Sequence, residues 1–272
     1  MFAHAFVRNA YLAGTFIALA CGAVGWFVVL RGQLFAGDAF GHVAWVGAIG
    51  AAVIGVDERV GLFALTIAVA VGMGALGRRG QADDTVIGMA FAWILGIGIL
   101  LVVVLAASAA GGNGAFATNT LFGSIYALSA GGSALAAAIA LAVAVGVAVV
   151  VRPMLLSTLD PELAALRGIP VRALGVGFLV ILAVVAAEST QAVGALLLLG
   201  LLAAPAGAAH QLTARPYVGL GLSAGIAVGA MWVGLALSYS IASLPPSSAV
   251  IGVAAAAYVA AGAAGRARLI KG

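Results

Sequence analysis

Long apolar segments, separated by short polar or basic stretches, run along the whole chain. A helix that crosses the hydrocarbon core of a membrane needs roughly 20 apolar residues, and nine segments reach or approach this length. They cover residues 10–30, 36–56, 60–77, 85–107, 131–151, 173–188, 190–210, 217–240 and 247–264. Several follow one another closely, so eight spans with one broken or re-entrant segment are an alternative. The pattern predicts an all-α polytopic membrane helix bundle with 8–9 transmembrane helices.

Composition agrees with a membrane protein. Hydrophobic residues make up 65% of the chain and charged residues 7%, whereas a soluble domain needs far more charge on its surface. The net charge of +4 does not indicate nucleic acid, because membrane proteins collect Arg and Lys on their cytoplasmic side. We expect a single transmembrane domain over residues 1–272, with an additional short helix outside the membrane at 116–128.

Basic residues are distributed unevenly between the predicted loops. If the chain has nine spans and its N-terminus lies outside, ten basic residues lie inside and two outside. The inner ones are Arg31, Arg78, Arg79, Arg152, Arg167, Arg172, Arg215, Arg266, Arg268 and Lys271, and the outer ones are Arg8 and Arg59. This is the bias that the positive-inside rule describes, and it predicts a C-terminus inside. Loops without a basic residue, at 108–130, 188–191 and 243–248, then lie outside.

The polar inner loop after the fifth segment contains signals for a short helix. Asp160 is a good N-cap, because its carboxylate accepts from the free amides of the first turn. Pro161 suits the first helical position, and Glu162 complements the positive end of the helix dipole. Gly168 suits a left-handed terminator, and a proline follows it. These signals predict a helix over residues 161–167.

Three apolar residues of this helix, Leu163, Ala164 and Leu166, are expected to be exposed at the inner membrane face. Two interpretations are open: the residues rest on the membrane or the bundle, or they form a docking surface for a cytoplasmic subunit.

Two ionisable residues lie inside the second apolar segment, in the stretch GDAFGHVAW (37–45). Asp38 and His42 are four residues apart, so they share one face of a helix. By helical rise, Asp38 lies roughly 10 Å deeper than Arg31. An ionisable pair inside a span is costly and by default indicates a functional site. A carboxylate with an imidazole suits a divalent ion such as Mn(II), Zn(II) or Fe(II). The alternatives are a proton relay and an Asp–His hydrogen bond that joins two helices.

Other polar residues carry weaker signals. Glu188 lies next to a predicted outer loop, where it either attracts cations or is simply solvated. His210 lies near the inner end of its segment and is expected to be an interfacial residue without a role.

Two short motifs fail in their context. GMGALG (72–77) fits GxGxxG but lies in an apolar helix with no preceding strand. GLSAG (221–225) fits the nucleophile-elbow pattern, yet a hydrolase built on Ser223 lacks both the strand–turn–helix setting and a base. The chain has no P-loop sequence, and its only lysine is Lys271. We therefore expect no enzymatic activity, and any ATPase that drives transport must be a second polypeptide.

Four stretches resemble the permease subunit of bacterial ABC transporters for zinc, manganese and iron, the ABC-3 family. They are GDAFGHVAWVGAIGA (37–51), DDTVIGMAFAWILGIGILL (83–101), STLDPELAALRGIPV (157–171) and QAVGALLLLGLLAAPAGAAHQLT (191–213). In the same order, they are similar to the family's Gly-Asp-Ala-x-x-His motif, its acidic start of a Gly-containing helix, its cytoplasmic Asp-Pro segment and its Val-Gly…Pro-Ala helix. One departure is Val46, which stands where the family has a proline, so a built-in kink is lost.

The resemblance implies a permease of the bacterial inner membrane that imports a divalent transition metal and holds no permanent cofactor. It implies three partners: a cytoplasmic ATP-binding subunit, an extracytoplasmic metal-binding protein and a second permease copy. Asp38 and His42 would coordinate the metal on its path, and the helix that Asp160 begins would be the coupling helix. The alternatives are a stand-alone secondary carrier of metal or protons, and an ABC permease for a metal chelate of the siderophore type.

Overall fold

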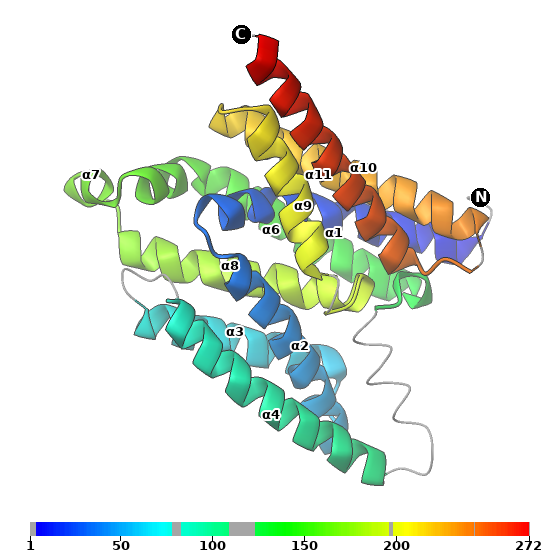
Figure 1. Ribbon diagram of the computed structural model, residues 1–272. Helices are drawn as coiled ribbons and strands as arrows, with labels where there is room; N and C mark the ends of the chain where they lie inside the picture. Colours follow the sequence, from blue (N-terminus) through cyan, green and yellow to red (C-terminus); the bar gives the residue numbers. More distant parts are fainter. Residues whose placement is uncertain (1–3, 78–82, 109–122, 196–197, 242, 272) are drawn as a thin grey trace.

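The computed structural model describes residues 4–77, 83–108, 123–195, 198–241 and 243–271. The elements in chain order are α1 (Ala5–Leu30), α2 (Leu34–Ile54), α3 (Glu58–Leu76), α4 (Asp84–Ser108), the 3-10 turn η2 (Ile125–Ala127), α6 (Ala130–Leu159), α7 (Pro161–Leu166), α8 (Val171–Ala192), α9 (Leu198–Leu212), α10 (Pro216–Ser240) and α11 (Pro246–Lys271). These ranges contain no β-strand, and the helices pack into one bundle (Figure 1).

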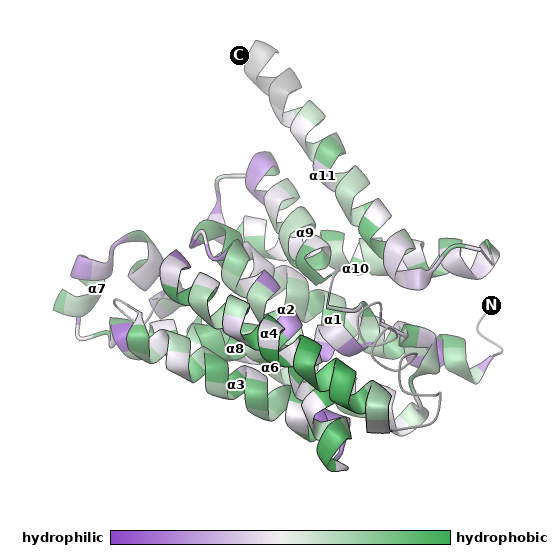
Figure 2. Ribbon diagram, turned by 60° about the horizontal axis from the view of Figure 1, so that its bottom comes forward, coloured by the Kyte–Doolittle hydropathy of each residue, from purple (hydrophilic) through white to green (hydrophobic). Residues whose placement is uncertain are grey.

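Eight helices in the described residues are long and apolar enough to cross a membrane. Apolar residues cover much of α4, as expected for a helix that contacts lipid (Figure 2). α9 is shorter, with 15 residues, which corresponds to about 22 Å of rise against a hydrocarbon core of about 30 Å. The prediction of an all-α polytopic bundle with eight or nine spans is confirmed.

Two predicted boundaries are wrong. The fifth segment is predicted to end at residue 151, but α6 continues to Leu159, so the first part of the predicted inner loop is helical. The sequence pattern predicts a loop at 188–191, but α8 continues to Ala192 and ends where Gly194 adopts a φ of 93°. α9 then begins at Leu198, so the expected span at 190–210 is a break followed by a shorter helix. This matches the alternative with one broken segment.

The additional helix expected at 116–128 can be followed only in its last part. Residues 109–122 lie outside the described residues. Beyond them, η2 forms a single short turn at Ile125–Ala127.

The predicted inner and outer loops gather at opposite ends of the bundle. At one end, Arg31 after α1 donates through Nε to Oγ1 of Thr158 near the end of α6, over 3.0 Å. At the other end, Arg59 in the first turn of α3 donates through Nε to Oε1 of Gln191 near the end of α8, over 3.1 Å. We call these the inner and the outer end, following the positive-inside assignment. Figure 1 shows the short helix α7 projecting from the inner end.

Small residues allow the helices to approach closely. A Cβ atom on Gly22 of α1 would lie 2.6 Å from Cα of Ala224 of α10, and one on Gly47 of α2 would lie 2.5 Å from the carbonyl oxygen of Gly61 of α3. Close backbone packing of this kind holds helices together in lipid, where the hydrophobic effect does not.

Candidate functional site

α2 carries both members of the predicted metal pair. A tight turn precedes it, in which the Gln33 amide donates to the Val28 carbonyl over 2.9 Å. Gly32 in this turn has a φ of 66°, a left-handed conformation that favours glycine. The helix therefore restarts at once after α1, and it places Asp38 and His42 on successive turns in its inner half.

The His42 ring is held by its own helix. Its Nδ1 lies 3.1 Å from the main-chain oxygen of Asp38. Because a carbonyl oxygen only accepts, Nδ1 carries the hydrogen and Nε2 keeps a free lone pair. The edge of the ring meets Phe91 of α4 at 5.2 Å between centroids and 89° between planes. The imidazole is therefore oriented with one nitrogen available as a ligand.

The Asp38 carboxylate forms no hydrogen bond or ion pair with any described residue. The alternative of a side-chain Asp–His bond that joins two helices is therefore not what the structure contains, because the hydrogen bond of His42 runs to the main chain of α2 itself. The carboxylate is left available for another group.

The pair lies on an open face of the molecule. Asp38 and His42 are half-buried, and Phe35, which shares their face of α2, is 42% exposed. The other side of the helix is packed, since Phe40 and Val43 are fully buried. Within the described residues, no group of three or more His, Cys, Asp or Glu side chains could surround an ion. Asp38 and His42 thus form a two-residue group at the surface of the chain.

Val46 lies in an unbroken stretch of α2. It is 2% exposed and packs against α4, where a Cβ on Gly98 would lie 2.6 Å from its Cγ2. The helix is continuous where the family pattern has a proline, as the loss of that residue predicts.

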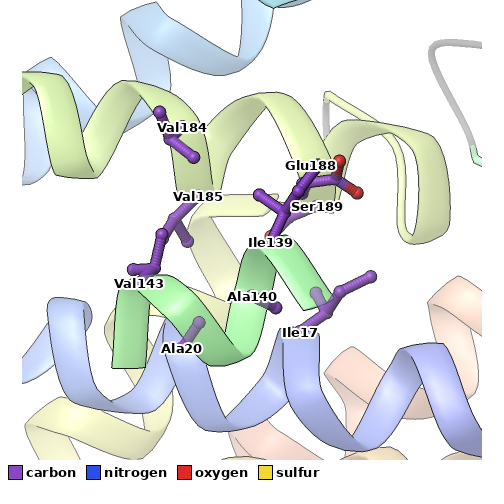
Figure 3. Close-up of a pocket in the computed structure, with 9 residues that line it drawn as sticks. All are labelled: Ile17, Ala20, Ile139, Ala140, Val143, Val184, Val185, Glu188 and Ser189. Atoms are coloured by element: carbon purple, nitrogen blue, oxygen red, sulfur yellow. The ribbon is translucent and has the colours of Figure 1, made fainter. Parts of the chain in front are cut away.

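Glu188 lies away from this pair, near the outer end of α8. It is 2% exposed, and its Oε2 lies 3.8 Å from Nη2 of Arg59. Neither of its carboxylate oxygens accepts a hydrogen bond from a described residue. Figure 3 shows Glu188 beside Ser189 at one end of a narrow pocket whose other lining residues are apolar. The expectation that this carboxylate is solvated is therefore wrong, and its role as a cation ligand stays a prediction.

Arg59 joins several helices at the outer end, which its position in a predicted loop does not indicate. Besides Gln191 and Glu188, it contacts α6 through Nη2, which donates to the Gly132 carbonyl over 3.3 Å. With Asp57 and Glu58 it lines a cavity of about 550 Å³ at the outer end. The sequence does contain one signal for the contact with Glu188. Arg59 and Glu188 have opposite charges and lie near the ends of two apolar segments, and charges inside a bundle usually pair.

α7 has the predicted end signals. Oδ1 of Asp160 accepts from the Leu163 amide over 2.9 Å, Pro161 is the first helical residue, and Gly168 has a φ of 76°. Leu166 is 86% exposed, but Ala164 is fully buried. The expectation that Ala164 is exposed is wrong, because its side of this single turn faces the neighbouring helices α6 and α8.

Ser223 and His210, for which no functional role is expected, are engaged in packing. The Ser223 hydroxyl donates to the Gly22 carbonyl over 2.6 Å and is fully buried. His210 Nε2 lies 3.1 Å from the Trp26 carbonyl, and the two rings stack at 5.1 Å. Each of these side chains joins α1 to a neighbouring helix.

Comparison with known proteins gives one family. The family model described as "ABC 3 transport family" matches residues 3–264. A solved structure, "PsaBC from Streptococcus pneumoniae in complex with Fab", superposes with a TM-score of 0.81 at 25% identity, covering 95% of this chain and 91% of that one.

Several curated relatives are similar over most of their length. The "Manganese transport system membrane protein MntC" of Halalkalibacterium halodurans is 28% identical, over 89% of this chain and 82% of its own. The "Manganese import system permease protein ScaB" of Streptococcus parasanguinis is 27% identical, over 87% and 82%. The "Probable iron transport system membrane protein" of Haemophilus influenzae is 25% identical, over 86% and 84%.

Proposed function

Because the chain belongs to the ABC 3 transport family, whose members are membrane permease subunits and not enzymes, we propose that it imports a divalent transition metal. ATP hydrolysis on a separate subunit drives the import, and a metal-binding protein outside the membrane delivers the ion. The curated relatives are permeases of manganese and iron transport systems. Manganese is therefore the first of the three candidate metals to test, before iron and zinc.

The unpaired Asp38 carboxylate beside His42 is the observation that carries the proposal. The carboxylate has no partner among the described residues, and His42 presents a free Nε2. A carboxylate and an imidazole are a suitable ligand set for Mn(II), Fe(II) and Zn(II). Two ligands bind an ion weakly, as a transport path requires.

A second permease copy follows from the exposure of this pair. A carboxylate inside the membrane is stable only where it faces a cavity or another protein, not lipid. The half-buried pair on the open face of α2 therefore faces the same surface of a second copy. When the copies approach, two pairs surround the ion, and when they separate, each pair alone releases it.

The docking surface for the ATPase subunit is the exposed side of α7. Leu166 is 86% and Leu163 is 38% exposed, at the inner end where an ATPase must bind. In this proposal, ATP binding by the partner moves α7 and switches access to the metal pair between the two sides of the membrane.

The first experiment measures metal uptake by cells that lack the gene and carry a plasmid-borne copy. We expect D38A/H42A to lower manganese uptake by about tenfold or more at equal membrane level, since loss of ligands removes most affinity for the metal. D83A/H4A, which removes the same residue types from exposed positions, is the matched control. Wild-type uptake by D38A/H42A would refute the role of the pair.

A second experiment tests the docking surface. We expect L163D/L166D to lose both uptake and co-purification of the ATPase subunit, because two charges replace apolar contact area. V56D is the control, because Val56 is 46% exposed at the opposite end. Normal uptake by L163D/L166D would favour a carrier that works without an ATPase.

A further inference from the structure

The side chain of Arg31 joins three elements at the inner end. Its Nε donates to Oγ1 of Thr158 over 3.0 Å, and its Nη2 lies 3.5 Å from Oγ of Ser157. Its guanidinium carbon lies 4.5 Å from the centre of the Phe178 ring. One cation thus connects the turn between α1 and α2 to the end of α6 and to α8.

Arg31 lies close in the chain to the proposed metal pair, and Thr158 lies close to the proposed docking helix α7. Arg31 precedes α2, and Asp38 lies seven residues further along the chain. Thr158 precedes Asp160 by two residues, and Asp160 caps α7. The Arg31–Thr158 bond is therefore a short connection between the metal pair and the docking helix.

The acceptors are oriented toward the cation. The Thr158 hydroxyl donates to the Met154 carbonyl over 2.6 Å, and the Ser157 hydroxyl donates to the same carbonyl over 3.0 Å. Because each hydroxyl hydrogen is engaged, the oxygen lone pairs remain for Arg31. Burial lowers the pKa of Arg31 to about 10, so the side chain remains a cation at neutral pH.

Three polar atoms at this joint have no partner among the described residues. They are Nη1 of Arg31 and both Nε2 and Oε1 of Gln33, all of them buried. Unpaired buried polar atoms are unfavourable, so an arrangement that pairs them would be more stable locally. The hydrogen bonds from Arg31 to Thr158 and Ser157 are therefore the polar contacts that hold this joint among the described residues.

We propose that Arg31 is a positioning residue that transmits the displacement of α7 to α2, and thereby to Asp38 and His42. This inference rests on the proposed function. Arg31 touches neither the metal nor the ATPase. It acts by keeping the α1–α2 turn attached to the end of α6, so that the metal pair follows the docking helix.

The test compares two substitutions of one acceptor. T158V keeps the shape of the side chain but removes the oxygen, whereas T158S keeps the oxygen. R31A removes the cation. R172A removes another arginine of the inner end, which is exposed and, among the described residues, bonds to the Ala75 carbonyl.

Each variant is measured for membrane level and for manganese uptake. The complex with its ATPase subunit is then reconstituted in proteoliposomes, and its ATP hydrolysis is measured. Mn²⁺ binding is followed by electron paramagnetic resonance.

We expect T158V and R31A to lower uptake by about tenfold, the factor that corresponds to one lost hydrogen bond to a charged group. ATP hydrolysis, Mn²⁺ binding and membrane level should stay near wild type, and so should every readout of T158S and R172A. Hydrolysis without uptake is the signature of lost transmission, which a merely structural contact would not produce.

Two results would overturn the inference. Wild-type uptake by T158V shows that the bond does not transmit, even if R31A fails to fold. A parallel loss of uptake, hydrolysis and membrane level in T158V shows that the bond only holds the fold together. Failure of the proposed function is a different outcome, because D38A/H42A would then transport manganese normally.

Discussion

Ionisable residues are few in this bundle, and they differ in burial and in whether they have a counterion. Glu188 is buried and pairs with Arg59 at 3.8 Å, whereas Asp38 is half-buried and has no partner among the described residues. A charge without a partner in a low-dielectric environment is costly. The Asp38 carboxylate is therefore the better candidate for binding a ligand, whereas the Glu188 carboxylate already lies beside a counterion.

The pair at the outer end makes a prediction about stability. Replacing Arg59 by Met leaves the Glu188 carboxylate buried without a counterion, and we expect a loss of about 3 kcal/mol, at the low end for broken buried pairs because Arg59 is partly exposed. R59M/E188M removes both charges and should recover most of this loss. Thermal unfolding of the purified protein in detergent measures the difference. A double variant less stable than R59M would show that Glu188 is not destabilised by losing its partner.

For single residues, the sequence predicts contacts with nearby main-chain groups better than it predicts which side chains are buried. The cap at Asp160 and the terminator at Gly168 were predictable, because both depend on main-chain groups a few residues away. The burial of Ala164 and Glu188 was not, because it depends on which helices pack against them. His42 shows both cases: its place on a helix face follows from spacing, but its contact with Phe91 of α4 does not.

Among the helices, α4 packs against the side of α2 that carries His42, one of the two proposed metal ligands. Phe91 of α4 meets the His42 ring at 5.2 Å. One face of α4 is tightly packed at Gly98, where a Cβ would lie 2.6 Å from Val46 and 3.2 Å from Trp45, but at Gly96 nothing lies within 4 Å. The same helix therefore offers a tight and an open glycine, two residues apart.

These two glycines give a matched test of the packing. We expect G98A to destabilise the protein by about 1–3 kcal/mol through overpacking, and to lower manganese uptake because α4 moves away from His42. G96A should leave uptake unchanged and add up to about 1 kcal/mol of stability through helix propensity. Unfolding temperature and uptake are measured for both. Equal effects of the two substitutions would show that α2 and α4 are not in tight contact there.

Helix boundaries show what the apolar pattern predicts and where it fails. The pattern locates α1, α2 and α4 well, because polar or basic residues follow or precede them. It places the end of α8 too early, because Glu188, Ser189, Thr190 and Gln191 resemble a loop although their side chains are satisfied or paired within the bundle. Polar residues inside a span are tolerated where neighbouring helices supply partners.

For the whole molecule, the arrangement of the ends agrees with the charge distribution along the chain. Arg31, Thr158 and α7 lie at one end, and Arg59 and Gln191 at the other. The positive-inside rule assigns the first of these ends to the cytoplasm, which is the side where an ATPase subunit has access. The orientation of the chain in the membrane stays a prediction from the loop charges, whereas the open face of α2 could be found only from the three-dimensional arrangement.

That open face makes the last prediction. A carboxylate at the centre of a lipid bilayer costs about 3 kcal/mol, so the surface that carries Asp38 is expected to be covered by a second copy of the chain. Phe35 is 42% exposed on the same face, and Val149 is 74% exposed on α6. We expect F35C, in native membranes, to form a dimer with a short bifunctional maleimide, and V149C to remain a monomer.

We expect little cross-linking through the native cysteine. The only native cysteine, Cys21, is buried and lies 3.0 Å from the Ser189 hydroxyl, so a reagent in the membrane does not reach it. If F35C stays monomeric although it reacts with a lipid-soluble maleimide, lipid covers this face, and the metal pair does not lie between two copies. If F35C cross-links and D38A/H42A lowers uptake in the same membranes, the ion passes along the interface, because Phe35 and Asp38 share one face of one helix.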